Sequence, residues 1–349
     1  MTSFHKKINR VIFFILFTLV FLFYLWSQLI GVTFFLLIIL DFFFTKFIQK
    51  FLKNRLDQNF YQILKYSLLI VLPFVFAIFI RTFLFDIYFV PSSSMERTLF
   101  PNDYVLINKI SYGTKIPKHM IDIPVIGSLF KKDNEPHIYD LYRSLKRFKD
   151  LKREDIVVFK SVTDNAKSLI KRIIGMPGDT LSIDNTTVKI NNILLEDKPE
   201  YSYSYMDNTQ NKMFLTQNYS NKEYNTLNLA LKKNLEKNIT QKPSWSFYIF
   251  PYSKQLEWTR DNYGPLIIPK KGMIITLNKD NLPIYDKLIS QYENEKITLS
   301  DNEIYNYTFK NNYYFMMGDN RHASIDSRVF GFVPENYVQG KLIYKYSNN

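Results

Sequence analysis

The chain has 349 residues, 46% of them hydrophobic, and a formal net charge of +13. It contains no cysteine, which excludes disulfides, thiolate catalysis and cysteine-ligated zinc. Its four histidines are scattered and lack the spacing of a zinc-binding motif, so we expect no metal and no cofactor. A basic chain favours nucleic acid or an anionic membrane surface as its partner. Because long apolar runs are present and nucleic-acid motifs are not, we predict a membrane and no nucleic acid.

The first predicted element is an apolar run over residues 11–40, interrupted by Ser27, Gln28 and two threonines. As one helix it would be about 45 Å long, more than the roughly 30 Å of a bilayer core but too short for two passes. We therefore predict a single tilted transmembrane helix. A signal peptide is disfavoured, because the run is longer than a signal-peptide core and no small-residue cleavage site follows it.

A basic segment, 41–65, separates this run from a second predicted span over 66–85, which contains Pro73 and Arg81. The positive-inside rule places the basic segment in the cytoplasm, and everything after residue 85 then lies outside. Three basic residues near the N-terminus argue for the opposite orientation. The basic residues of 41–65 are Lys46, Lys50, Lys53, Arg55 and Lys65, and those near the N-terminus are Lys6, Lys7 and Arg10. The larger group decides the predicted orientation.

Residues 86–349 contain short β-branched or aromatic runs bounded by turn residues, a pattern typical of a mainly-β domain. The predicted strands cover 105–107, 156–159, 169–174, 180–183, 273–277 and 313–317. Segments 111–151 and 200–246 have the composition of insertions. In the second, Leu227, Leu231 and Leu235 predict a short helix capped by Asn225 or Thr226.

Ser94, just after the second span, is a candidate nucleophile that requires a base. One reading is a Ser-His-Asp triad with His322 and either Asp319 or Asp326. The other base is Lys171, in a strand-like run. Alternation along a strand turns Lys171 and Arg172 to opposite faces, so one can be buried while the other stays in solvent. A desolvated lysine has a lowered pKa, as a base requires.

Another reading makes Ser168 the nucleophile. Ser168 to Lys171 fits the S-x-x-K box of penicillin-recognising acyl-transferases, and Ser300-Asp301-Asn302 fits their second box. No Lys-Thr-Gly follows, and Ser168 lies in a β-branched run instead of at a helix start. Both points disfavour this reading.

Four segments, in order, resemble the conserved boxes of bacterial type I signal peptidases, and two predicted spans precede them as in that family. The resemblance implies N-terminal transmembrane helices followed by a mainly-β catalytic domain of antiparallel sheets with two insertions. Residues 1–85 would be the membrane anchor and 86–349 the extracytoplasmic catalytic domain. The segments are Pro91–Leu99, Arg153–Phe159, Lys171–Asp179 and Met317–Pro334.

Carried over residue by residue, the resemblance implies a Ser/Lys dyad. Ser94 would be the nucleophile and Lys171 the general base, with the Ser92 hydroxyl and the Ser94 N–H as the oxyanion hole. Ser324 would orient the lysine. Asp326 and Arg328 would form a structural ion pair. The candidates for the wall that receives the substrate are Tyr88, Val90, Met95 and Ile170.

The implied activity is a serine endopeptidase in the bacterial cytoplasmic membrane. It would remove signal peptides from exported preproteins after small residues at −1 and −3, through an acyl-enzyme. Its expected partners are preproteins and a bilayer with anionic phospholipid, and the protein-export translocon is a further candidate. Arg97 and His322 depart from the family pattern, which usually has proline and an acidic residue there. A membrane-anchored binding protein with a silent site is the non-enzyme alternative, in which Ser94, Lys171 and Ser324 would all be idle.

Overall fold

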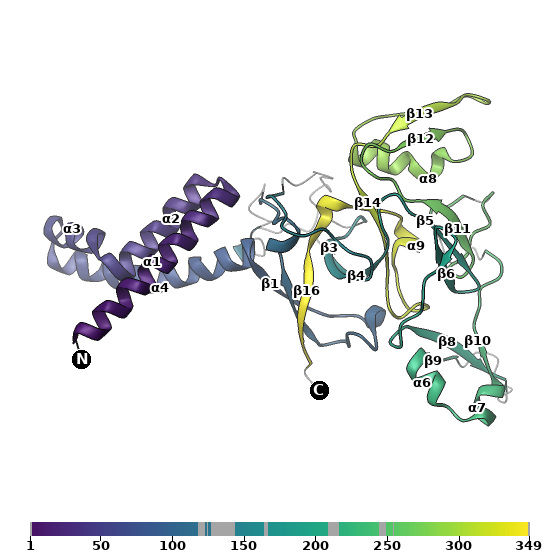
Figure 1. Cartoon of the computed structure of the whole chain (residues 1–349), viewed down its shortest axis with the longest axis horizontal. Coiled ribbons are helices and arrows are strands. Elements are labelled where there is room, and N and C mark those ends of the chain that lie inside the picture. The colour runs from purple at the N-terminus through teal and green to yellow at the C-terminus, as the bar shows by residue number, and fades with distance from the viewer. Residues whose placement is uncertain are drawn as a thin grey trace.

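The computed structural model describes residues 2–117, 123, 125–126, 144–163, 167–208, 216–243, 249–253 and 255–347. Helices from the first quarter of the chain lie at one end of the molecule, and the sheets lie at the other (Figure 1). The helices of the N-terminal part are α1 Thr2–Ser27, α2 Ile30–Leu40, α3 Phe47–Arg55 and α4 Gln58–Phe83. The later helices are α6 Asn221–Thr226, α7 Leu229–Asn234, α8 Leu282–Lys287 and α9 Ser327–Phe330.

The predicted single helix over 11–40 is wrong, because the run breaks between α1 and α2. Gln28 ends α1 with a left-handed backbone, φ 54°. The Ser27 hydroxyl then accepts a hydrogen bond from the Leu29 N–H, 3.2 Å away. Since α2 packs against α1, apolar surface of each helix is covered by the other. Ser27 and Gln28 thus form a turn between the two helices. The sequence did not reveal this turn because the residues on both sides of it are strongly apolar.

The basic segment 41–65 is also more ordered than the predicted loop. A π-helical turn over Asp41–Thr45 leads into α3, and the Asp41 carboxylate accepts hydrogen bonds from the N–H groups of Phe47 and Ile48. The second span begins earlier than predicted, at Gln58, and ends at Phe83. Asp57 caps it by accepting from the Asn59 N–H.

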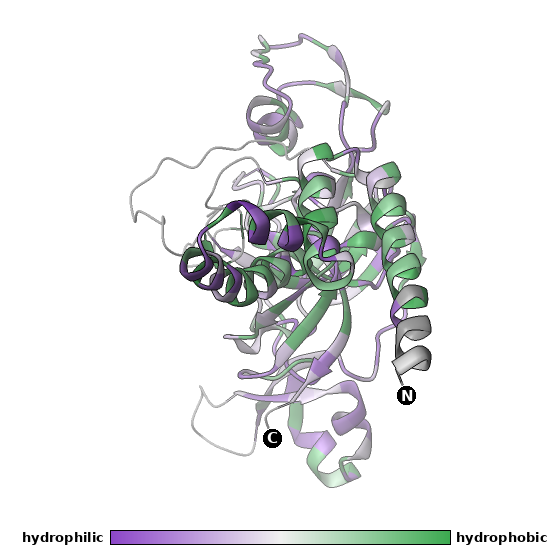
Figure 2. Ribbon diagram, turned by 90° about the vertical axis from the view of Figure 1, so that its left-hand side faces the viewer, coloured by the Kyte–Doolittle hydropathy of each residue, from purple (hydrophilic) through white to green (hydrophobic). Residues whose placement is uncertain are grey.

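Among the residues that the structure describes, one helix, α4, is by itself long and apolar enough to cross a membrane. A second candidate membrane span combines Ile30–Thr45 with α3, but these two helical parts meet at an angle of 82°. Hydrophobic residues follow one another along much of the N-terminal helical region, with some hydrophilic turns between them (Figure 2). Many of them face outward, as Phe34 and Ile70 do with 64% and 74% of their surfaces exposed. Such surfaces suit a lipid environment.

The domain that follows is mainly β, with antiparallel strand pairing, as predicted. Its largest sheet has seven strands in the order β1-β2-β16-β3-β4-β14-β15. They are β1 Phe85–Phe89, β2 Tyr104–Asn108, β3 Ile156–Lys160, β4 Ser168–Gly175, β14 Tyr313–Met317, β15 Val333–Pro334 and β16 Val338–Tyr346. The smaller sheets are β11-β5-β6-β7, β10-β8-β9 and β12-β13.

The remaining strands are β5 Thr180–Asp184, β6 Thr187–Ile190, β7 Ile193–Leu194, β8 Ser202–Asp207, β9 Thr216–Ser220, β10 Leu235–Lys237, β11 Tyr263–Ile267, β12 Ile274–Leu277 and β13 Tyr305–Thr308. All six predicted strand segments fall on β2, β3, β4, β5, β12 and β14. The main hydrophobic core contains buried side chains of β3, β4, β5, β11 and β14, such as Phe159, Ile173 and Phe315. Burial of β-branched and aromatic residues there stabilises the sheets on which the site is built.

The two segments read as insertions differ in how far the structure describes them. Of the predicted insertion 111–151, the described residues are 111–117, 123, 125–126 and 144–151, and the rest lies outside them. Within 200–246, the sheet β10-β8-β9 carries α6 and α7. The expected single helix is two short ones, capped by Ser220 and Asn228 instead of Asn225 or Thr226. Leu235 belongs to β10.

Candidate active site

Ser94 lies in a single 3₁₀ turn, Ser93–Met95, between β1 and β2. Ser92 before it is extended, and the Glu96 N–H closes the turn on the Ser93 carbonyl at 2.9 Å. Leu99 then donates its N–H to the Met95 carbonyl, at 2.7 Å. The turn is fixed by its own backbone, and it leaves only 9% of Ser94 exposed.

Lys171 lies in the middle of β4 and points at this turn. Its Nζ is 2.7 Å from Oγ of Ser94 and 3.0 Å from the carbonyl oxygen of Ile170. Only 3% of the side chain is exposed. Burial lowers the pKa of Lys171 to about 8, against the opposing influence of Asp326 and Asp319. A substantial share of this amine is therefore neutral near physiological pH and can accept a proton.

The segment after β14 holds the serine turn against β4. Met317 is paired with Arg172, so the chain leaves β14 beside Lys171. The Asn320 N–H donates to the Ser94 carbonyl at 3.1 Å, and the Asn320 side-chain amide donates to the Ser93 carbonyl at 3.2 Å. A β-carbon added to Gly318 would be 2.4 Å from the Ser94 carbonyl oxygen. Only glycine allows the two segments to approach this closely.

Ser92, the predicted oxyanion donor, is near Ser94, the predicted nucleophile. Its Oγ lies 3.3 Å from Oγ of Ser94, while Ser92 itself is exposed to solvent. A hydroxyl beside the nucleophile, together with a backbone N–H of the same turn, is the donor pair that a tetrahedral intermediate requires. The structure therefore groups Ser92, Ser94 and Lys171.

Ser324 is buried beside the same glycine. A β-carbon on Gly318 would meet Ser324 Oγ at 2.3 Å, so Ser324 and the Ser94 carbonyl flank Gly318. Within the described part of the chain, the structure records no hydrogen bond between Ser324 Oγ and Lys171 Nζ. The orienting role expected of Ser324 stays a prediction.

Asp326 and Arg328 form a buried ion pair next to this loop, with nitrogen–oxygen distances of 2.9 and 2.8 Å. Burial alone would raise the pKa of Asp326, but the charge and hydrogen bonds of Arg328 hold it below its usual value. Asp326 also accepts from the Gly318 N–H at 3.1 Å, and Arg328 donates to the Arg321 carbonyl at 2.6 Å. The pair thus links both ends of the loop that clamps Ser94.

A second buried ion pair was not predicted. Arg172 donates two hydrogen bonds to Asp319, at 2.8 and 2.6 Å, and the Thr98 hydroxyl donates to Asp319 at 2.5 Å. Lys171 and Arg172 are therefore both buried, and the expectation that one stays in solvent is wrong. The second face of β4 is covered as well, since the ring of Tyr201 lies 5.6 Å from the Arg172 guanidinium. Asp319 ties the residues after the nucleophile to β4.

The four residues predicted to receive the substrate belong to one hydrophobic cluster. Val90 and Met95 are buried in it, with 3% and 1% of their surfaces exposed. Tyr88 and Ile170 are partly buried against it. Because Ile170 and Met95 adjoin Lys171 and Ser94 in the sequence, this cluster forms an apolar wall beside Ser94 and Lys171.

His322, the alternative base, and Ser168, the alternative nucleophile, form hydrogen bonds with residues other than Ser94 and Lys171. His322 accepts a hydrogen bond from the Ser204 N–H at Nδ1, 2.9 Å away, and its Nε2 lies 3.0 Å from Asp261. Both ring nitrogens thus contact other groups than Ser94. Ser168 donates to Gln339 at 3.0 Å. Neither contact favours the triad or the S-x-x-K reading.

A buried serine hydroxyl within hydrogen-bonding distance of a lysine amine of lowered pKa is the arrangement of serine hydrolases that use lysine as their base. Comparisons with known proteins identify the family. A family model described as signal peptidase, peptidase S26, matches residues 63–245 and 264–347. The chain belongs to this signal peptidase family and is a serine endopeptidase.

Two relatives called signal peptidase I come from Buchnera aphidicola strains. That of subspecies Schizaphis graminum is 32% identical over 74% of this chain and 67% of its own length. That of subspecies Baizongia pistaciae is 30% identical over 75% and 70%. A crystal structure of a signal peptidase I from Enterococcus faecalis is 22% identical and covers 56% of this chain and 98% of its own. Its TM-score of 0.27 is too low to describe the arrangement seen here.

Proposed function

We propose that this signal peptidase cleaves preproteins with Ser94 as nucleophile and Lys171 as general base. The observation that carries the proposal is the 2.7 Å distance between Lys171 Nζ and Ser94 Oγ in a buried site. The purified full-length chain in detergent should therefore cleave a secretory precursor at its signal-peptide junction. Failure to cleave any precursor, by a folded sample that keeps its thermal unfolding transition, would refute the function.

The reaction begins with the neutral Lys171 amine accepting the proton of the Ser94 hydroxyl, while Oγ attacks the carbonyl carbon of the scissile bond. The Ser92 hydroxyl and the Ser94 N–H donate hydrogen bonds to the resulting oxyanion. The Lys171 ammonium then protonates the leaving amine, and an acyl-enzyme remains on Ser94. Lys171, neutral again, takes a proton from a water molecule, whose oxygen attacks the ester carbonyl. The Lys171 ammonium then returns this proton to Ser94 Oγ as the bond to the acyl group breaks, and the acid product leaves.

Activity should depend on pH through Lys171. Because only the neutral amine is a base, kcat/KM should fall about tenfold for each pH unit below the pKa of about 8 and level off above it. The measurement is the cleavage rate of a soluble precursor between pH 6 and 10. A His322→Gln variant should keep the same acid limb. An acid limb that disappeared in this variant would contradict the lysine mechanism.

The wall formed by Tyr88, Val90, Met95 and Ile170 suits the small residues that the substrate would carry at −1 and −3. A preprotein lying extended beside this wall would place its scissile carbonyl between Ser94 Oγ and the oxyanion donors. Apolar surface continues onto nearby strands, where Ile87 and Phe89 of β1 are 56% and 47% exposed. This surface would hold the site close to the bilayer.

Residues 1–85 are proposed as a multi-pass anchor and 86–349 as the extracytoplasmic domain, with the basic region around α3 in the cytoplasm. Because the chain lacks cysteine, single introduced cysteines report on orientation. Asn54→Cys should resist a membrane-impermeant maleimide added to spheroplasts, whereas Lys233→Cys should react. Both residues are exposed to solvent in the structure. The reverse labelling would invert the proposed topology. Anionic phospholipid and the export translocon are proposed partners at this surface.

A further inference from the structure

Arg321, in the loop that clamps Ser94, is a buried cation without a carboxylate on its two outer nitrogens. Only 2% of its surface is exposed, and within the described part of the chain its Nε and Nη2 atoms have no hydrogen-bond partner. Its Nη1 lies 3.9 Å from the Sδ atom of Met317. Keeping a guanidinium from water is costly unless another group stabilises its charge.

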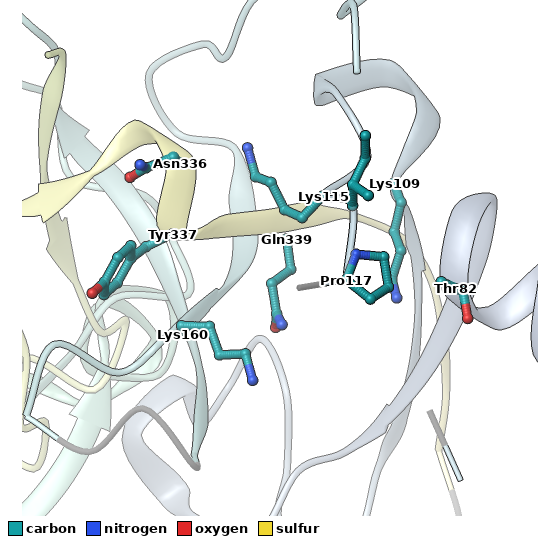
Figure 3. Close-up of a pocket in the computed structure, with 9 residues that line it drawn as sticks. Thr82, Lys109, Lys115, Pro117, Lys160, Asn336, Tyr337 and Gln339 are labelled. Atoms are coloured by element: carbon teal, nitrogen blue, oxygen red, sulfur yellow. The ribbon is translucent and has the colours of Figure 1, made fainter. Parts of the chain in front are cut away.

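Two basic side chains elsewhere in the molecule show the usual way in which this cost is met. Beside the cavity of about 50 Å³ in Figure 3, the Lys109 amine lies 3.0 Å from the Asp86 carboxylate, and the Lys115 amine donates to the Ser144 hydroxyl at 2.7 Å. Each amine thus has an oxygen atom as its partner. Arg321 requires a partner of another kind.

The acidic residues whose charges act on Arg321 hydrogen-bond other groups. Arg172 donates to Asp319 at 2.8 and 2.6 Å, and the Tyr203 hydroxyl donates to Asp197 at 2.6 Å. Neither carboxylate supplies the Nε and Nη2 atoms of Arg321 with an acceptor.

The group that faces the Arg321 guanidinium is the ring of Tyr201, whose centroid is 3.9 Å away. The Arg172 guanidinium lies 5.6 Å from the same centroid, so this one ring contacts two cations. Tyr201 is fully buried, and burial raises its pKa to about 12, which keeps the hydroxyl neutral at physiological pH. The π-electron face of a neutral ring attracts a cation, and most strongly where water is excluded.

The backbone that follows this tyrosine is joined to the same loop. The Ser202 N–H donates to the Asp319 carbonyl, and the Arg321 N–H donates to the Ser202 carbonyl, both at 2.9 Å. Asn320 lies between these two contacts. Its N–H and its side-chain amide are the groups that bind the carbonyls of the serine turn.

We propose that Tyr201 is a positioning residue of the protease. Its ring binds the guanidinium groups of Arg321 and Arg172, and it thereby holds Asn320 against the turn that carries Ser94. The inference rests on the proposed role of Ser94 as nucleophile. Segment 200–246, which the sequence indicated as an insertion, thus contributes to the geometry of catalysis through the residue that precedes β8.

Two substitutions in the full-length protein separate the ring face from the hydroxyl. Tyr201→Phe should keep kcat within about twofold, since it removes only a hydroxyl that has no hydrogen-bond partner among the described residues. Tyr201→Leu fills the space without a π face, and kcat for precursor cleavage should fall about 30-fold. KM should change little, because the proposed substrate wall belongs to a different hydrophobic cluster. A loss in Tyr201→Phe equal to that in Tyr201→Leu would overturn the proposal.

A graded test replaces Tyr201 with phenylalanine and with its mono-, di- and trifluorinated analogues. Fluorine withdraws electron density from the ring face and weakens its attraction for a cation, while the shape of the ring changes little, so folding is retained. We expect kcat to fall stepwise, by about twofold for each fluorine, at constant KM. Equal kcat values along the series would overturn the proposal.

The matched control is the same series at Tyr205. This residue belongs to the same hydrophobic cluster and is 4% exposed, but its ring stacks on the ring of Tyr224 at 4.6 Å. Fluorination there should leave kcat unchanged. The same stepwise loss at both positions would trace the effect to the stability of the cluster and would overturn the role of Tyr201.

The outcomes also separate this inference from the catalytic proposal. Equal kcat values along the Tyr201 series, in a protein that Ser94→Ala inactivates, refute the positioning role alone. Full activity in Ser94→Ala refutes the catalytic proposal, and with it the positioning role, whatever the fluorinated series shows.

Discussion

Ser94→Ala should lower kcat for precursor cleavage by about 10⁶-fold, the scale on which a serine hydrolase loses activity with its nucleophile. The reason is that no other hydroxyl in the described site lies at hydrogen-bonding distance from Lys171. The measurement is single-turnover cleavage of a labelled precursor by the purified variant. Unfolding temperature should change little, because the substitution removes one oxygen atom from a turn fixed by backbone hydrogen bonds.

The matched control is Ser93→Ala, in the same turn. Ser93 contributes its carbonyl to the contact with Asn320, and this contact is independent of the side chain. This variant should retain cleavage within a few fold of the wild type. Full activity in Ser94→Ala, or equal losses in both variants, would show that another group is the nucleophile.

The variants Lys171→Met and Lys171→Arg test whether Lys171 acts as a general base or only through its positive charge. Methionine fills the buried space without an amine, and arginine keeps the charge but is not deprotonated at accessible pH. Both variants should lose at least about 10³-fold in kcat. General acid–base catalysis typically contributes about 10²–10⁴-fold. Recovery of activity in Lys171→Arg would indicate an electrostatic role. A residual activity that depended on His322 would favour the triad.

Removing one partner of the buried pair Asp326–Arg328 should cost about 3–5 kcal/mol of unfolding free energy, the typical penalty for an uncompensated buried charge. In Arg328→Met the Asp326 carboxylate loses the guanidinium and keeps the backbone N–H groups of Gly318 and of position 328 as donors. Denaturant unfolding of the full chain, followed by the signal of the β domain, measures the loss. Activity should fall with it, because the pair links the ends of the loop that holds Ser94.

The pH dependence of this effect has a definite sign. Since the folded-state pKa of Asp326 lies below its usual value, the ion pair stabilises the protein at neutral pH and the benefit is lost as pH falls through that folded value. The double variant Asp326→Asn/Arg328→Met should be less destabilised than Arg328→Met alone. Lys279→Met, which breaks an exposed ion pair with Asp301, is the control and should change stability little. Equal effects of Arg328→Met and Lys279→Met would contradict the structural role.

The sequence predicted the strands well where short apolar runs end at clear turns, as in the run 169–174 before Gly175 and Met176. It also predicted Ser94, Ser92 and Lys171 as members of one site, through four boxes in a fixed order. Their grouping in the structure depends on β4 and β14 being neighbours, with Met317 opposite Arg172. Pairing between strands so distant in the chain is not contained in any local pattern.

The errors have two kinds of physical origin, burial produced by distant segments and local turns or caps that the composition does not mark. Strand alternation predicted that Arg172 or Lys171 would reach solvent, but Asp319 and the ring of Tyr201 cover the second face of β4. The apolar content of 11–40 predicted one helix, because a tight turn at Gln28 needs no glycine or proline to mark it. The caps Ser220 and Asn228 were missed because a chain rich in serine and asparagine offers many equivalent caps.

The two residues that depart from the family pattern, Arg97 and His322, have a shared consequence for engineering. Arg97 forms an ion pair with Glu223 of α6 at 3.1 Å, and His322 accepts from the backbone of Ser204 in β8. Both therefore connect the catalytic loops to the segment 200–246. In a chimera with another protein, segment 200–246 and positions 97 and 322 should therefore be exchanged together. A graft that moved 200–246 alone into another protein would leave its contact residues Arg97 and His322 behind in the donor.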